Sequence, residues 1–199
     1  MDGCVAQALM ELKHETTHAI HAPSHCTPPA HGTEIQCAAI NTSLPLGEGK
    51  INFIQRAIGK LLHCARAVDP AMLHSINDIS RSAAKGTEAT PAATVHSLNC
   101  AHTHPDEETI CRTSDVILRI DSDAACLVAP GARSGAGGHH YLSDKQGTTF
   151  NGPALVLAKV IQNAMASAAE AESAALFMNA QEAPETALKQ WAIHSLPHH

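Results

Sequence analysis

The apolar residues between positions 51 and 68 recur three and four positions apart. This spacing predicts one amphipathic helix with a broad apolar face, formed by Phe53, Ile54, Ala57, Ile58, Leu61, Leu62, Ala65 and Val68. We expect this helix to end at the Val-Asp-Pro sequence, because a residue that precedes proline disfavours helical geometry. Two further helices are predicted over about 71–84 and about 91–101, the second with Thr90 as its N-cap and Pro91 in its first turn.

The period of the pattern changes after a polar break at 102–109. Apolar and polar residues alternate over 116–121, as in a β-strand, and 139–143 and 154–161 are two more strand candidates. The Ala-rich segment 167–183 is predicted to be a helix. The fold class is therefore α/β, with helices first and a β-β-β-α segment after them. The predicted parts are a His- and Pro-rich irregular arm at 1–50, with a short helix near 6–13, a helical segment at 51–105 and an α/β domain at 106–199.

The composition limits both the core and the partners. Hydrophobic residues make up 44% of the 199 residues, which is enough for a core, but aromatic residues make up only 3%. Alanine dominates the apolar positions, and small side chains bury little area each, so we expect modest stability. The formal net charge of −6 has the wrong sign for a surface that must hold a nucleic acid by itself.

The N-terminal sequence and the cysteines indicate an intracellular protein. The segment MDGCVAQALMELK lacks the basic start and apolar centre of a secretory signal peptide. The longest strongly apolar run, PALVLAKVI, is too short to cross a membrane. We therefore expect a cytoplasmic or nuclear location, no membrane partner, and free thiols for the seven cysteines.

Two pairs of acidic residues are the candidates for chemistry. Asp121 and Asp123 lie two apart on a predicted strand, so their side chains project from the same face. Glu170 and Glu172 lie at the start of the last predicted helix. Carboxylates of a strand and a helix end can converge on Mg²⁺, although solvated acids are common at such ends. Ser167-x-x-Glu170 has the spacing of a capping box, which leaves Glu172 as the freer metal ligand.

The segments around these acids resemble the ribonuclease H region of copia-type retrotransposon polyproteins. The resemblance is carried by DSDA, GARSGAGGHHYLS and NGPALVLAKVIQNAMASAAEAESAALFMNAQEA, in this order. The upstream segment FIQRAIGKLLHCARAVDPAMLHSINDIS is similar to the connection region that follows the reverse transcriptase in the same polyproteins. Together these resemblances cover 34–183. They imply an incomplete ribonuclease H-like unit with a mixed sheet, preceded by a helical connection segment.

The resemblance also implies an activity and its residues. In such domains Mg²⁺ ions promote hydrolysis of the RNA strand of an RNA–DNA hybrid. Asp123 would be the first metal-binding carboxylate and Glu172 the helix carboxylate, with Asp121 and Glu170 as accessory acids. The implied partners are an RNA–DNA hybrid and the reverse transcriptase domain of the parent polyprotein.

Departures from the family pattern predict that the activity is lost. The next family carboxylate lies in a T-D-N-x-A segment after a fourth strand, and this sequence ends LKQWAIHSLPHH before it. With that ligand missing we expect weak or no Mg²⁺ binding. Several positions at which related elements tend to have tyrosine carry His or Cys, which indicates sequence decay: His63, Cys64, Cys100 and Cys126. The chain is therefore either a nuclease fragment or a non-catalytic structural or interaction remnant.

Three other interpretations have weaker support. The His- and Cys-rich stretches HETTHAIHAPSHC and CAHTHPDEETIC could bind zinc, but neither has compact ligand pairing, and Pro23 interrupts a helix that would align His18, His21 and His25. GARSGAGG follows a strand, yet no helix follows it, so a turn is favoured over a phosphate-binding loop. Cys126 has no base at a defined offset, which favours a small buried residue over a nucleophile.

Overall fold

The computed structural model describes residues 3–16, 18–25, 37, 42–83 and 86–194, with side chains up to residue 189. It divides into two compact units. The first comprises Met1–Pro29 and Ile40–Thr109, and the second comprises Ala30–Ala39 and Ile110–His199. Among the described residues, no helix combines the length and the hydrophobicity that a membrane crossing requires.

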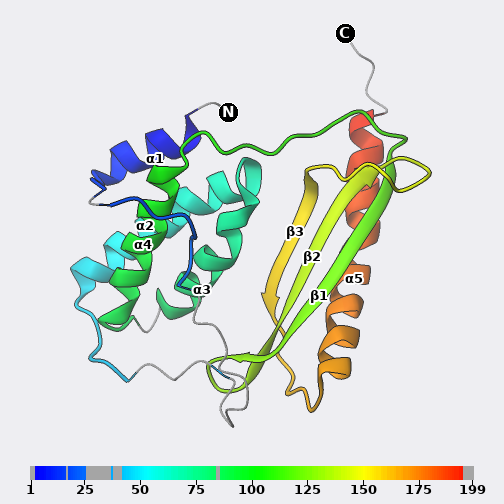
Figure 1. Ribbon diagram of the computed structural model, residues 1–199. Coiled ribbons are helices and arrows are strands. Elements are labelled where there is room, and N and C mark those ends of the chain that lie inside the picture. The colour runs from blue at the N-terminus through cyan, green and yellow to red at the C-terminus, as the bar shows by residue number, and fades with distance from the viewer. Residues whose placement is uncertain (1–2, 17, 26–36, 38–41, 84–85, 195–199) are drawn as a thin grey trace. The chain divides into compact units, whose positions relative to one another are not determined.

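The first unit is helical. Its elements are α1 (Cys4–Leu12), α2 (Glu48–Ala67), a short 3₁₀ helix η1 (Pro70–Met72), α3 (Leu73–Ala83) and α4 (Ala89–Thr103) (Figure 1). The apolar face predicted for α2 supplies Ile54, which is fully buried with Ile79 and Ala83 of α3 and with Leu46. The helix ends before Asp69-Pro70, as its sequence predicted.

Two helix starts differ from the prediction. The segment 71–84 begins with η1, because the Asp69 carboxylate accepts a hydrogen bond from the Ala71 amide at 3.0 Å and so caps the turn before α3. Burial raises the pKa of Asp69 above its usual range, and the Ala71 amide opposes that effect. Helix α4 begins at Ala89, so Thr90 lies inside it and is not its N-cap. The Thr90 hydroxyl instead accepts a hydrogen bond from the Thr87 amide at 3.2 Å.

A disulfide joins α1 to α2. Val5, Ala8, Leu9 and Leu12 are the buried face of α1. Cys4 and Cys64 are bonded across the two helices, with their Cα atoms 6.0 Å apart, which is within the usual range for a disulfide. The expectation of free thiols is therefore wrong for this pair. It holds for the other described cysteines, which are Cys37, Cys100, Cys111 and Cys126.

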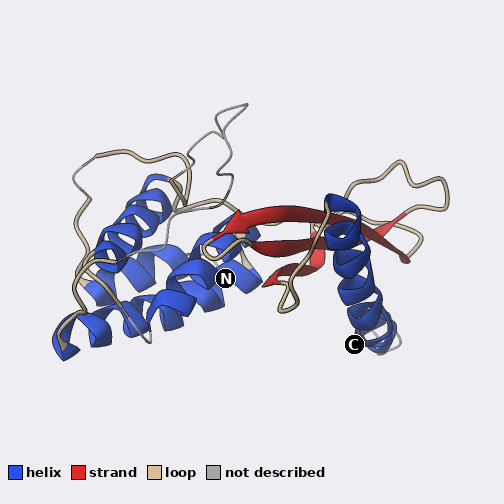
Figure 2. Cartoon of the chain, turned by 90° about the horizontal axis from the view of Figure 1, so that it is seen from below, coloured by secondary structure: helices blue, strands red, loops and turns tan. Residues whose placement is uncertain are grey.

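The described residues of the second unit form three strands and one helix. Strands β1 (Ile117–Ala129), β2 (Arg133–Ser143) and β3 (Pro153–Val160) form an antiparallel sheet in the order β1-β2-β3, and α5 (Ala168–His194) packs on it (Figures 1 and 2). The predicted β-β-β-α order is confirmed. The predicted mixed sheet is wrong for the described strands, because both of their pairings, β1 with β2 and β2 with β3, are antiparallel.

Strand β2 begins earlier than predicted. The turn that joins it to β1 needs positive φ angles only at Gly131 and Ala132 (74° and 53°), and the chain is extended from Arg133 onward. Most of GARSGAGG is therefore strand and not loop. Cys126 likewise lies inside β1 and not after it, packed against the core of the unit as a partly buried side chain.

The core between the sheet and α5 is built mainly from small residues. Its buried members are Ala136, Leu157, Ile161, Ala171 and Ala175. The two helix alanines are fully buried, which lets α5 approach the strands closely. Because alanine buries little apolar area, polar contacts carry a larger share of the specificity of this packing than in an ordinary core.

Candidate functional site

Asp121 and Asp123 lie in the middle of β1, with both carboxylates exposed. Their cross-strand neighbours on β2 are His139 and Gly137. Ser122, which lies between the two acids, bonds to α5, and successive side chains of a strand point to opposite faces. The two acids share a face, as their spacing predicts, but it is the face of the sheet that points away from α5.

Glu170 makes the capping contacts that its spacing from Ser167 predicted, whereas Glu172 is exposed. The Glu170 amide donates to the Ser167 hydroxyl at 3.2 Å, and the Glu170 carboxylate accepts from the Ala166 amide at 2.6 Å. Glu170 is therefore occupied in closing the first turn of α5, and its predicted structural role is confirmed. Glu172 is exposed one residue after the buried Ala171.

The four acids do not form a metal site in this structure. We expected Asp123 to face Glu172 between the strand and the helix, but Asp123 points to the opposite face of the sheet because Ser122 occupies the helix-facing register. No group of three His, Cys, Asp or Glu side chains in the described parts of the chain is close enough to hold a metal ion. The residues present therefore do not fit the paired Mg²⁺ ions that the resemblance implies.

The absence of a three-ligand group among the described residues also argues against the zinc hypothesis. His21 and His104 come together, with Nδ1 and Nε2 3.1 Å apart, although they are far apart in the sequence. A structural zinc site needs four ligands of this kind, and the described residues provide no third one beside the pair. Cys26, which ends the His-rich stretch, lies outside the described residues.

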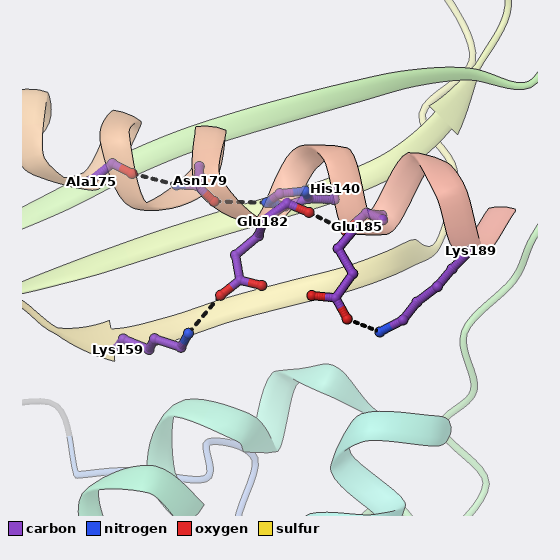
Figure 3. A network of polar contacts seen from close by, with 8 residues as sticks. His140, Lys159, Ala175, Asn179, Glu182, Glu185 and Lys189 are labelled. Atoms are coloured by element: carbon purple, nitrogen blue, oxygen red, sulfur yellow. Dashed lines mark hydrogen bonds and ion pairs between the residues drawn. The ribbon is translucent and has the colours of Figure 1, made fainter. Parts of the chain in front are cut away.

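The most connected polar site in the second unit is centred on Asn179. Its amide nitrogen lies 3.0 Å from the Ser122 hydroxyl, 2.9 Å from the Gly137 carbonyl oxygen and 3.0 Å from the Ala175 carbonyl oxygen. Its amide oxygen lies 2.9 Å from Nε2 of His140 (Figure 3). Asn179 and His140 are both fully buried, so this network ties α5 to β1 and β2 at one point.

The network fixes the proton position on His140. Three oxygen atoms surround the Asn179 amide nitrogen, so that nitrogen is the donor and the amide oxygen must face His140. His140 therefore carries its proton on Nε2 and donates it to Asn179. The other ring nitrogen, Nδ1, is buried without a hydrogen-bond partner. The hydrogen bonds of the network therefore use only one of the two ring nitrogens.

Ion pairs flank the network at the solvent edge. Lys159 of β3 contacts Glu182 of α5 at 2.8 Å, and Lys189 contacts Glu185 one turn later at 2.7 Å (Figure 3). The hydrogen bond and the positive charge from Lys159 lower the pKa of Glu182. These pairs are largely exposed and add little stability, but Lys159–Glu182 connects α5 to the third strand.

Sequence reasoning missed His140 and Asn179. The sequence does show an asparagine in an Ala-rich helix and a histidine in a strand, but it does not reveal that these two residues contact each other. The glycine at position 138 is a further sign of this close contact. A Cβ atom at Gly138 would lie 2.6 Å from Cγ of Asn179, so the residue beneath the amide must be glycine.

The hydrogen bonds of Asn179 align and hold α5 on the sheet. No protein family model, no curated protein and no solved structure matches the chain.

Proposed function

We propose that the chain is a non-catalytic fragment of a copia-type retrotransposon polyprotein. It would comprise the connection region that follows the reverse transcriptase and part of the ribonuclease H domain. The observation that carries this proposal is the antiparallel β-β-β-α unit, in which S-D-A lies on β1 and A-E-A-E lies at the start of α5. Both the order of the elements and the places of the motifs agree with the resemblance.

The ancestral activity would be two-metal hydrolysis of RNA in RNA–DNA hybrids, and we propose that it is lost here. Asp123 points away from α5, so the strand carboxylate and Glu172 do not share an ion. Without that anchor an ion has no position from which to activate water or stabilise the leaving oxygen. The net charge of −6 also opposes binding of a hybrid, which depends on contacts with its phosphates.

A role as an interaction or structural remnant is the second candidate. The outer side of α5 exposes large apolar side chains, with Leu176, Phe177 and Leu188 each more than 60% accessible. A surface helix usually places such residues against a partner, and α5 has apolar residues on both of its sides. This observation favours a scaffold or binding role over catalysis, whereas the described residues contain no three-ligand group to support a zinc-binding module.

Metal binding tests the loss of the site without requiring a nucleic acid. We expect Mn²⁺, followed by its electron paramagnetic resonance signal, to show no saturable binding at millimolar concentrations. The Asp123→Asn variant should give the same titration as the unchanged chain, because Asp123 belongs to no three-ligand group among the described residues. Saturable binding that Asp123→Asn abolishes would contradict the proposal and would mean that the carboxylates can rearrange around an ion.

A further inference from the structure

Helix α5 has a second apolar side, opposite the one that packs on the strands (Figure 2). Because an α-helix has about 3.6 residues per turn, a residue two positions from a buried one points to the opposite side. Phe177 follows the buried Ala175 at this spacing, and Leu188 follows the buried Thr186 in the same way. The sheet therefore leaves both large side chains uncovered.

The exposed side of α5 carries a continuous row of apolar residues, called the outer stripe here. It comprises Phe177, Ala180, Pro184 and Leu188, at spacings of three, four and four residues, and all four are exposed. The exposed Leu176 enlarges its N-terminal end. No charged residue interrupts the stripe. Exposed apolar side chains that are contiguous in this way mark a surface that meets a partner.

The order of side-chain sizes along the outer stripe reads the same from both ends. A large residue stands at each end, and the small Ala180 and the compact Pro184 lie between them. Two copies of α5 that run antiparallel would place Phe177 of each copy beside Leu188 of the other. The small residues would meet in the middle, where they let the helices approach closely. A surface that complements itself in this way fits a two-fold symmetric pair.

The charges along α5 favour the antiparallel direction. Glu170 and Glu172 lie near the start of the helix, whereas Lys189 lies near its end and is paired with Glu185 at 2.7 Å. A parallel pair would bring the acidic starts of both copies together. An antiparallel pair keeps these carboxylates apart and places each acidic start beside the half of the other helix that carries Lys189. It also sets the two helix dipoles in opposite directions.

We propose that a second copy of this chain covers the outer stripe, so that two α5 helices pair antiparallel in a symmetric dimer. The proposal rests on the interaction role given above as the second candidate function, and it names the partner. The stripe offers a few side chains from one helix, which is less than the roughly 800 Å² per partner of a standard interface. The dimer is therefore weak, and its population depends on concentration.

Sedimentation of the full chain at different concentrations tests this proposal. Between about 5 µM and about 500 µM we expect a shift from mostly monomer to mostly dimer, with covalent dimers excluded on a non-reducing gel. Phe177→Glu should weaken association at least about tenfold, because each dimer would then bury two unpaired carboxylates. A chain that stays monomeric at the highest concentration would overturn the proposal.

Met10→Glu provides the matched control for Phe177→Glu. Met10 is a large apolar residue that is 73% accessible on another helix, α1. The same new charge there should leave the association unchanged, with the helical content of both variants checked by circular dichroism. If Met10→Glu and Phe177→Glu weakened association equally, the outer stripe would not be the interface.

A mixture of Phe177→Glu and Leu188→Lys tests the antiparallel register. Each variant alone sets an unpaired charge against an apolar side chain at both ends of the stripe, so it should remain monomeric. In the mixture, the new carboxylate of one chain would lie beside the new ammonium group of the other. The unchanged phenylalanine and leucine would meet at the opposite end. We expect a heterodimer at least about tenfold tighter than either variant with itself, and its absence would refute the antiparallel pairing.

These results are independent of the metal site. A monomeric chain would remove the second copy as the partner of α5 but would leave the Mn²⁺ titration as it is. Saturable Mn²⁺ binding that depends on Asp123 would contradict the proposed loss of the site without changing the association of α5. The two proposals can therefore fail separately.

Discussion

Gly138→Ala should disrupt the second unit more than the same change at Gly135 or Gly137, the other two glycines of β2. The new Cβ atom would lie 2.6 Å from Cγ of Asn179 and closer still to its amide oxygen. Asn179 cannot withdraw, because Ser122, Gly137 and Ala175 hold its nitrogen. Overpacking together with loss of the buried hydrogen bonds should lower the free energy of unfolding by about 3–5 kcal/mol. Chemical denaturation followed by circular dichroism measures this change.

Gly137→Ala is the matched control for Gly138→Ala. It adds the same methyl group one residue earlier, on the face away from α5, where the nearest atom is the Asp123 carbonyl oxygen at an ordinary 3.7 Å. We expect a change of less than about 1 kcal/mol there. Combining Gly138→Ala with Asn179→Ala removes the clash, so the pair should be no less stable than Asn179→Ala alone. Equal effects of Gly137→Ala and Gly138→Ala would contradict the packing described for Asn179.

Reduction of the Cys4–Cys64 disulfide should have a second large effect, in the first unit. The bond closes a loop across a sequence separation of 60 residues. In the chain-entropy account, opening a loop of this length costs about 4 kcal/mol, because the unfolded chain gains freedom. Thermal unfolding with and without dithiothreitol should therefore show a clear loss of stability on reduction. Cys4→Ser should unfold as the reduced chain does and should no longer respond to the reductant.

Cys111→Ser provides the control for that experiment. Cys111 is exposed and free, so this variant should keep the full response to dithiothreitol. Thiol counting by mass spectrometry after alkylation gives an independent check, since Cys4 and Cys64 should escape labelling until the chain is reduced. Labelling of both residues in the unreduced, folded chain would show that α1 is held by its apolar face alone.

The helical part of the fold was readable from the sequence where periodicity is strong. The residues 51–68 have a clear three- and four-residue repeat and a proline stop, and α2 follows them closely. The starts of α3 and α4 were harder to place, because they depend on which side chain accepts a hydrogen bond from a backbone amide. The Asp69 carboxylate accepts a hydrogen bond from the Ala71 amide at the start of η1. The Thr90 hydroxyl accepts one from the Thr87 amide. Such competition between neighbouring polar groups leaves no mark in the hydrophobic pattern.

The sheet shows why the candidate site could be predicted only in part. Alternation correctly placed Asp121 and Asp123 on one face, but a period of two does not say which face a helix will cover. That choice depends on Asn179, which selects Ser122 and His140 as partners from two different strands. The glycines of β2 suggested a loop, whereas one of them makes room for that asparagine. The pairing of Cys4 with Cys64 depends in the same way on how α1 packs.

Cleavage of a labelled RNA–DNA hybrid by the purified chain tests our proposal that the second unit derives from a ribonuclease H domain and has no working metal site. With Mg²⁺ or Mn²⁺ present we expect no cleavage above that of a metal-free sample, and the same result for Asp123→Asn and Glu172→Gln. The reason is that Asp123 and Glu172 do not converge and the described residues contain no three-ligand group. Metal-dependent cleavage that disappears in Asp123→Asn would contradict this account, and would show that Asp123 acts in a two-metal site after all.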